Sequence, residues 1–327
     1  IGDVVDPDAV DIHRTLAGGV TAVQQLHGSA NPIGGQSSLI KLRYGRNADG
    51  LRFADAPGSI KFALGENVKQ SNWGEHTRYP QSRMGVEQVF REAFIRARDY
   101  AAERDRYAAM KPKERAAAPA FRRDLELEAL VEILEGKRHI TCHSYVRSEI
   151  LMLMRVADEL GFKVNTFTHI LEGYKVARSL KAHGANASTF SDWWAYKMEV
   201  KDAIPYNAAL MHGEGLNVCL NSDDAEMGRR LNQEAAKVMK YGGVPAEDAW
   251  KMVTLNPAKA LHVDHRTGSL EVGKDADVVV WSADPLTIAA RAEQVYVDGV
   301  RYYDVAREAE REALVRAERA RIVAKMI

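Results

Sequence analysis

The sequence predicts an α/β fold built as a (β/α)8 barrel of the TIM type, followed by a small β element and a C-terminal helix. Three observations support this. Apolar segments rich in Val, Ile, Thr and Phe recur between segments of helical periodicity, as is typical of parallel α/β folds. Glycines stand at the junctions, ending helices or preceding strands. The regular βα alternation in the second half favours a barrel.

Seven segments are predicted as strands, which leaves one of the eight barrel strands unaccounted for. They are residues 20–26, 39–42, 59–65, 139–143, 164–169, 185–190 and 217–223. The helices expected around them are residues 8–17, 84–110, 122–135, 147–160, 171–183, 204–213, 229–241 and 245–254. Pro257 follows the last of these closely and ends the alternating pattern. We therefore assign residues 1–257 to the barrel.

The pattern changes beyond Pro257. Short apolar runs separated by Gly and Asp turns, between residues 268 and 299, predict a small β element over residues 258–304. Residues 305–327 are rich in Ala, Glu and Arg, with opposite charges four residues apart, and are predicted as an exposed helix. Their apolar positions are too sparse to favour a coiled coil.

Composition excludes several classes of protein. The chain of 327 residues carries 45 basic and 45 acidic residues, so its zero net charge argues against a nucleic-acid or anionic-membrane binder. Cys142 and Cys219 are its two cysteines, which excludes a disulfide framework and a four-cysteine zinc site. The chain begins at Ile1 without an initiator Met, so we expect a processed or truncated piece of a longer protein. We expect a soluble protein, cytoplasmic or exported.

Three predicted strands end in a residue that binds metals or moves protons: His143, His169 and Asp223. The spacings of 26 and 54 residues correspond to one βα unit and then two. All three side chains are therefore expected at the C-terminal rim of the barrel, where barrel active sites lie. Two imidazoles and a carboxylate suit Zn²⁺ or a similar ion, and the carboxylate could instead act as general base. The alternative for each His alone is that it caps its strand.

The segments around these three residues resemble motifs of a known protein family. Segments 141–143, 167–175 and 220–223 resemble the strand-five His, strand-six His and strand-eight Asp motifs of the amidohydrolase superfamily. Further segments resemble its imidazolonepropionase-like branch: residues 17–23, 28–36, 61–67 and 189–197. The resemblance extends through residues 256–261 and 273–277 and covers the chain to about residue 304.

The resemblance implies a metal-dependent hydrolase of C–N bonds in amides, peptides or cyclic amides. It implies a barrel flanked by a small β-sandwich assembled from both chain ends. His143 and His169 would bind one or two divalent ions, with zinc favoured. Asp223 would bind metal, accept a proton from the attacking water and deliver it to the leaving nitrogen.

One motif of the family is missing. Its members carry a His-X-His pair at the end of strand one, and no such pair occurs in this sequence. We therefore expect strand one, its two histidines and the first sandwich strands to lie outside this chain. Either the chain is a fragment, or another polypeptide supplies these strands. Zinc occupancy is expected to depend on the missing histidines. For the strand-four ligand, a carboxylated Lys or a Glu in the family, we predict Glu66 over Lys61, because Glu66 is nearer the C-terminal end of its strand.

Residues after the strands are expected to contact a small-molecule or peptide substrate. Trp193, with its aromatic neighbours, would wall a pocket, and Lys197 or Arg147 would hold a carboxylate. Tyr145, two residues after His143, is similarly placed. The alternative for the tryptophans is packing against neighbouring loops. No nucleic-acid or membrane partner is expected. The unpaired edges of an incomplete sandwich would favour a homo-oligomer.

Two other hypotheses stay open. In the first, the chain is a catalytically silent barrel fragment with a structural or assembly role, because two expected ligands are absent. In the second, the barrel is a metal-free isomerase or lyase that uses His143 and His169 as acid and base, which leaves Asp223 without a role. Stoichiometric Zn²⁺ in the purified chain would favour the hydrolase over the fragment.

Overall fold

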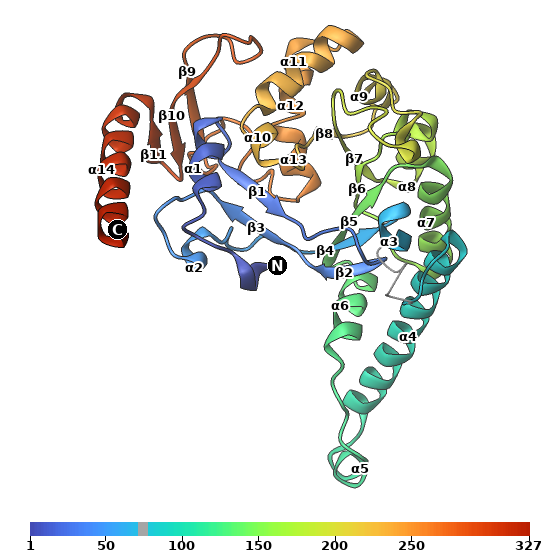
Figure 1. The fold of residues 1–327 in the computed structure, drawn as a ribbon. Helices are drawn as coiled ribbons and strands as arrows, with labels where there is room; N and C mark the ends of the chain where they lie inside the picture. Colours follow the sequence, from blue (N-terminus) through green and yellow to red (C-terminus); the bar gives the residue numbers. More distant parts are fainter. Residues whose placement is uncertain (71–77) are drawn as a thin grey trace.

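The computed structural model describes residues 1–70 and 78–327, and a six-stranded sheet lies at its centre (Figure 1). The strands, in the order in which they pair, are β2 (Ile33–Gln36), β4 (Gly58–Ala63), β5 (Arg138–Ser144), β6 (Thr166–His169), β7 (Asn186–Thr189) and β8 (Val218–Leu220). β4 to β8 are parallel, and β2 pairs antiparallel with β4. Within the described residues this ladder runs from β2 to β8 and does not close into a ring.

Five of the seven predicted strands are confirmed in the parallel sheet as β4 to β8. The prediction of 20–26 and 39–42 as further barrel strands is wrong, because β1 (Ala22–Gln25) and β3 (Ser38–Lys41) pair antiparallel in a separate sheet. Residues 26–37 between them contain no helix, whereas parallel neighbours need a long crossover connection. The same connection contains β2, which the sequence analysis missed because two of its four residues are glycine.

Helices follow the parallel strands, as predicted. They are α3 (Glu66–Gln70), α4 (Arg83–Ala109), α5 (Pro112–Ala117), α6 (Leu125–Leu134), α7 (Arg147–Leu160), η2 (Gly173–Lys175), α8 (Ala177–His183), η3 (Met198–Val200), α9 (Asn207–Gly213), α10 (Ala225–Gly228), α11 (Leu231–Gly242), α12 (Ala246–Lys251) and α13 (Leu255–Ala260). α7 shows why they form. Its buried Ile150, Leu153 and Ala157 recur at helical spacing, and Gly161, with φ of 71°, ends the helix in the left-handed conformation.

The main core lies between the parallel sheet and these helices. An aromatic cluster joins β4 to α4 within it. The Phe62 ring stacks on Phe90 with centroids 5.4 Å apart, and the Phe94 ring stacks on Phe162 at 3.8 Å. α4, α5 and α6 together form a long arm that projects from the body of the molecule (Figure 1). Burial of these rings, about 150–250 Å² each, anchors the base of the arm.

A second core joins the two ends of the chain. It lies between α1 (Val10–Ala17), the β1–β3 sheet and a three-stranded sheet of β9 (Val278–Trp281), β10 (Ala292–Val297) and β11 (Val300–Asp304). Ile40 from β3 packs in the same cluster as Val295 from β10. The β element predicted after residue 257 is therefore confirmed as a sheet, and residues near the N-terminus share its core.

The remaining elements are short or peripheral. They are η1 (Gly2–Val4), α2 (Ala48–Leu51), η4 (Val305–Arg307) and α14 (Glu308–Met326). α14 matches the predicted charged helix and stands at the outer edge of the molecule beyond β11 (Figure 1). In the part of the chain that the structure describes, no helix is both long and apolar enough to cross a membrane.

Candidate active site

His143 and His169 lie side by side at the C-terminal ends of β5 and β6. These strands pair in a register that places Ser144 opposite His169, so the two imidazoles are one residue out of step. Their ring centroids are 4.7 Å apart and their planes are inclined by 75°. Both side chains are buried. The sheet thus brings together the two histidines that the sequence analysis selected.

Asp223 lies three residues beyond the end of β8, and its side chain lies next to this pair of histidines. Its Oδ2 is 3.7 Å from Nε2 of His169. The backbones of Asp223 and His169 both have positive φ, 49° and 66°, a conformation that costs a non-glycine residue free energy and that clusters at functional sites. The parallel sheet therefore collects all three predicted residues at one edge.

The surroundings keep both imidazoles neutral. Burial lowers the pKa of His169 to about 3, and the positive charges of Lys61 and Lys197 act in the same direction. Burial also lowers the pKa of His143 well below its usual range, with His169 and the two lysines adding to the effect. Among the described residues, neither ring nitrogen of His143 has a hydrogen-bond partner, and Nδ1 of His169 also lacks one.

This donor chemistry fits a divalent metal ion. Neutral imidazole nitrogens are the form that Zn²⁺ binds, and buried nitrogens without hydrogen bonds are otherwise costly. Within residues 1–70 and 78–327, however, no group of three or more His, Cys, Asp or Glu side chains converges as a complete metal site. The residues present would thus supply part of a coordination shell.

Glu66 and Lys61, the two candidates from strand four, have different surroundings. Glu66 begins α3, and its Oε1 is 3.1 Å from Nζ of Lys197. Lys61 lies within β4 with only 4% of its surface exposed, and its Nζ donates to the backbone oxygen of His27 at 2.6 Å. Burial lowers the pKa of Lys61, while the negative charge of Asp223 opposes the shift. Lys61 therefore shares the electrostatic environment of Asp223, and Glu66 is held by Lys197.

Aromatic side chains line the approach to the histidines. The Tyr145 ring lies edge-on to His143 with centroids 4.6 Å apart, and its hydroxyl is 3.1 Å from that of Tyr196. Burial, and then the bond with Tyr196, raises the pKa of Tyr145 above its usual range. Trp193 stacks on Phe190 at 4.3 Å, and Phe190 stacks on His169 at 5.0 Å. An aromatic cluster therefore follows strand seven, and Trp193 reaches the histidine through Phe190. That it walls a substrate pocket stays a prediction.

The two predicted carboxylate-binding residues differ in availability. Lys197 contacts both Glu66 and Glu199, whose Oε2 is 3.2 Å from its Nζ, and lies over the Tyr145 ring. Two carboxylates therefore already neutralise its charge. Arg147 begins α7 with an exposed side chain, and its backbone N–H donates to Glu172 at 3.0 Å. Glu199 was not predicted from the sequence, since it lies in η3, a three-residue 3-10 helix too short to show periodicity.

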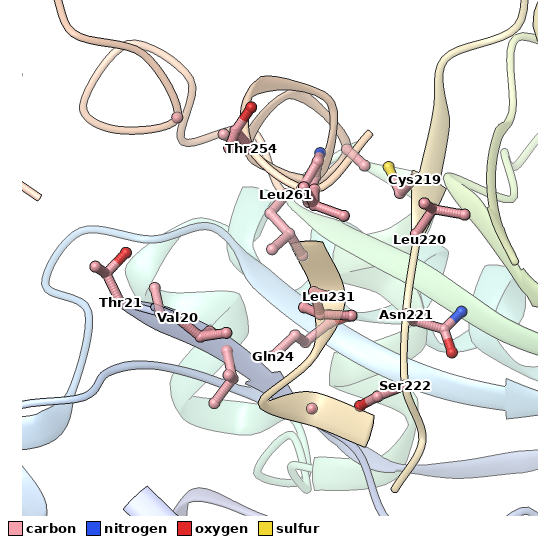
Figure 2. Close-up of a pocket in the computed structure, with 18 of the residues that line it drawn as sticks. Val20, Thr21, Gln24, Cys219, Leu220, Asn221, Ser222, Leu231, Thr254 and Leu261 are labelled. Carbon is pink, nitrogen blue, oxygen red and sulfur yellow. The ribbon is translucent and has the colours of Figure 1, made fainter. Parts of the chain in front are cut away.

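A cavity of about 1300 Å³ opens beside this cluster. Asp223, His169, Thr254 and Leu261 are among its lining residues. Figure 2 shows two of its walls, with Val20, Thr21 and Gln24 on one side and residues 219–222 on the other. Residues of both β1 and β8 therefore line the cavity, and His169 and Asp223 open onto it.

Comparison with known proteins identifies the family. The model of the amidohydrolase family matches residues 60–323. The amidohydrolase tasK of Hapsidospora irregularis is 32% identical over 310 residues, covering 88% of this chain and 31% of that protein. The crystal structure of an amidohydrolase from Thermotoga maritima MSB8 superposes with a TM-score of 0.84 at 33% identity, covering 93% of this chain and 77% of the other.

A shorter similarity is to a deaminase. The 5-methylthioadenosine/S-adenosylhomocysteine deaminase of Thermoanaerobacter pseudethanolicus is 40% identical over 81 residues, which are 22% of this chain and 19% of that protein. The chain spans about a third of the length of its curated relative tasK. The family model matches well over half of the residues, and the matched region includes His143, His169 and Asp223. The chain therefore belongs to the amidohydrolase family.

Proposed function

We propose that the protein is a metal-dependent hydrolase that cleaves a C–N bond of an amide, a peptide or a cyclic amide. The observation that carries this proposal is the pair of buried, neutral imidazoles without hydrogen-bond partners among the described residues, next to Asp223 in a chain of the amidohydrolase family. A divalent ion, zinc in our proposal, would supply Lewis-acid activation of water and of the substrate carbonyl.

His143 and His169 would hold the ion through their ring nitrogens. Asp223 would accept the proton of the attacking water and pass it to the leaving nitrogen. Desolvation at the cavity edge raises the pKa of Asp223, Lys61 opposes this and Asp224 adds to it. A raised pKa brings a carboxylate closer to the working pH, which favours both halves of the proton transfer.

We propose Lys61, in place of Glu66, as the group from strand four. Its buried amine and lowered pKa favour the neutral form, which is the form that can be carboxylated. Glu66 is better explained as the partner of Lys197. For the substrate we propose that Tyr145 and Trp193 wall the pocket and that Arg147 holds a carboxylate, since the charge of Lys197 is already neutralised by two glutamates.

We further propose that the sheet belongs to a (β/α)8 barrel of the imidazolonepropionase-like branch. The cavity supports this, because residues of β1 and β8 line it and β8 is the last strand of the described parallel ladder. Buried side-chain oxygens of Gln25 and Asn221 lack partners among the described residues and would gain them there. The division into residues 1–257, 258–304 and 305–327 stays a proposal, with residues of α1 and β3 added to the second unit.

The test is Asp223→Asn in the intact protein, assayed on a panel of N-acyl amino acids, dipeptides and cyclic amides. We expect turnover to fall by about 10²–10⁴-fold, the usual contribution of a general base. Zinc content, measured by mass spectrometry, should change little, because the imidazole nitrogens remain. Near-normal turnover of Asp223→Asn would exclude the proposed role.

Asp224→Asn is the matched control. Asp224 is adjacent in the chain and caps α10 by accepting from the backbone N–H groups of Glu226 and Met227. Asn caps helices about as well as Asp, so this variant should keep both its fold and its turnover. Equal losses of turnover in both variants would show that the charge of the segment matters and that Asp223 has no specific chemical role.

A further inference from the structure

α14 is exposed on every side over most of its length. It extends 19 residues from Glu308, and every residue from 312 to 327 is exposed. Large apolar side chains are among them: Leu314 is 66% exposed, Val323 45% and Ile327 102%. In proteins, packing of one face supplies most helical stability, and residues 312–326 of α14 have no such packing within the described chain. Its own i,i+3 and i,i+4 ion pairs contribute only about 0.3–0.5 kcal/mol each.

Charge is distributed unevenly along α14. Residues 308–312 contain three glutamates and one arginine, whereas residues 316–325 contain three arginines, one lysine and one glutamate. The N-terminal part is therefore acidic and the C-terminal part is basic. A helix with this distribution is complementary to a second copy of itself that runs in the opposite direction.

One side of the helix is free of charge and suited to such a contact. At 100° per residue, Ala313, Ala317, Ala320, Ala324 and Ile327 fall within a sector of about 80°, with Leu314 and Val323 beyond its two borders. Their spacing alternates between three and four residues, as at a two-helix interface. The charged residues begin at the borders of this sector.

We propose that α14 pairs antiparallel with α14 of a second copy of this chain. Placing Ala313 opposite Ala320 of the second copy also places Ala309 opposite Ala324, which fixes the register. Glu310 then faces Arg321 and Lys325 across one border, and Glu312 faces Arg319 across the other. In a parallel pair the same borders would place Glu310 beside Glu312 and Arg319 beside Arg321, which is repulsive. Arg316 faces Arg316 of the second copy near the two-fold axis, but this single repulsive contact is outnumbered by the border pairs, each of which occurs twice. Charge complementarity thus selects the antiparallel arrangement.

The first experiment is analytical ultracentrifugation of the 327-residue chain over a range of concentrations and salt. We expect a monomer–dimer equilibrium that weakens as salt screens the border pairs. Reversing the acidic end (Glu310→Lys with Glu312→Lys) should weaken the dimer by about tenfold or more, since each change acts twice in a symmetric pair. Adding Arg319→Glu and Arg321→Glu should restore it. A chain that stays monomeric at every concentration, or a dimer that ignores the reversal, would overturn the proposal.

Cysteine crosslinking tests the direction of the pair. Ala317→Cys lies near the two-fold axis and should form a disulfide-linked dimer under mild oxidation, whereas Ala309→Cys alone should not. Mixing Ala309→Cys with Ala324→Cys should link the two variants. Both native cysteines are buried, so they should contribute no background. Efficient crosslinking of Ala309→Cys to itself would indicate a parallel pair and would overturn the antiparallel proposal. All these positions are exposed on α14, so the substitutions should leave the folded body intact.

Discussion

Lys41 forms a buried ion-pair cluster, and we predict that removing its charge destabilises the fold. Its side chain on β3 is fully buried. Its Nζ lies 2.6 Å from Asp275, 3.0 Å from Asp277 and 2.5 Å from Asp298, all in or next to the C-terminal sheet. Burial opposes the charge of Lys41, yet the hydrogen bonds to Asp275 and Asp298 more than offset it and raise the pKa of the amine. The ammonium thus joins the N-terminal segment to the C-terminal sheet.

The perturbation is Lys41→Met, which keeps the shape of the stem and removes the charge. Removing one partner of a buried ion pair costs about 3–5 kcal/mol. Two of the three aspartates keep a cation, since Arg43 lies 2.6 Å from Asp298 and Arg266 lies 2.8 Å from Asp275. Asp277 loses its cation and keeps hydrogen bonds from Thr267 and from the backbone of Asp298. We therefore expect the lower end of the range, about 3 kcal/mol.

The assay is urea denaturation, followed by circular dichroism and by tryptophan fluorescence. A loss of about 3 kcal/mol corresponds to roughly 4 °C in Tm for a chain of 327 residues, because unfolding entropy is about 2.1 cal/mol/K per residue. Lys163→Met is the matched control, because Lys163 forms a single pair with Asp158 and its side chain is 67% exposed. Such surface pairs contribute about 0–1 kcal/mol. Equal destabilisation by the two variants would refute the reasoning, because it would show that the buried position of Lys41 adds nothing.

Two further predictions concern the histidine pair and the aromatic core. In protein stripped of metal, stability should fall as the pH drops below 6.5, by about 1.4 kcal/mol per pH unit for each buried His, because the unfolded chain binds protons that the folded chain refuses. For His169 this loss of stability continues to about pH 3. His169→Gln should therefore lose stability less steeply with falling pH than the wild type. Equal slopes of unfolding free energy against pH in the two proteins would contradict this prediction. Phe94→Ala should cost about 3–5 kcal/mol, since this fully buried ring stacks on Phe162. Ile95→Ala, at a 49% exposed position on the same helix, should change the unfolding free energy little, and similar losses in both variants would argue against the packing explanation.

The sequence by itself determined the parallel strands and the residues that end them. Segments such as 164–169, rich in Val, Thr and Phe, contain strands buried on both faces. Their residue pattern is visible within a few consecutive residues, so the sequence also shows which residue ends each strand. His143, His169 and Asp223 were found in this way, and so was the charged helix at residues 305–327. Their spacing in whole βα units predicted that the three residues lie at the same edge of the sheet, because the C-terminal ends of parallel strands all lie at one edge.

Only the tertiary structure decided which strands join which sheet. Residues 20–26 and 39–42 have an apolar pattern like that of the parallel strands, yet they pair with each other and pack on β9 to β11, because pairing depends on connection length and on distant partners. The different surroundings of Glu66 and Lys61, on which the proposal of Lys61 rests, are also tertiary. Lys197, 131 residues from Glu66 in the sequence, holds that carboxylate, while Lys61 is buried near Asp223. Ion pairs between residues so far apart in the sequence produce no periodic pattern, so they cannot be predicted from the sequence.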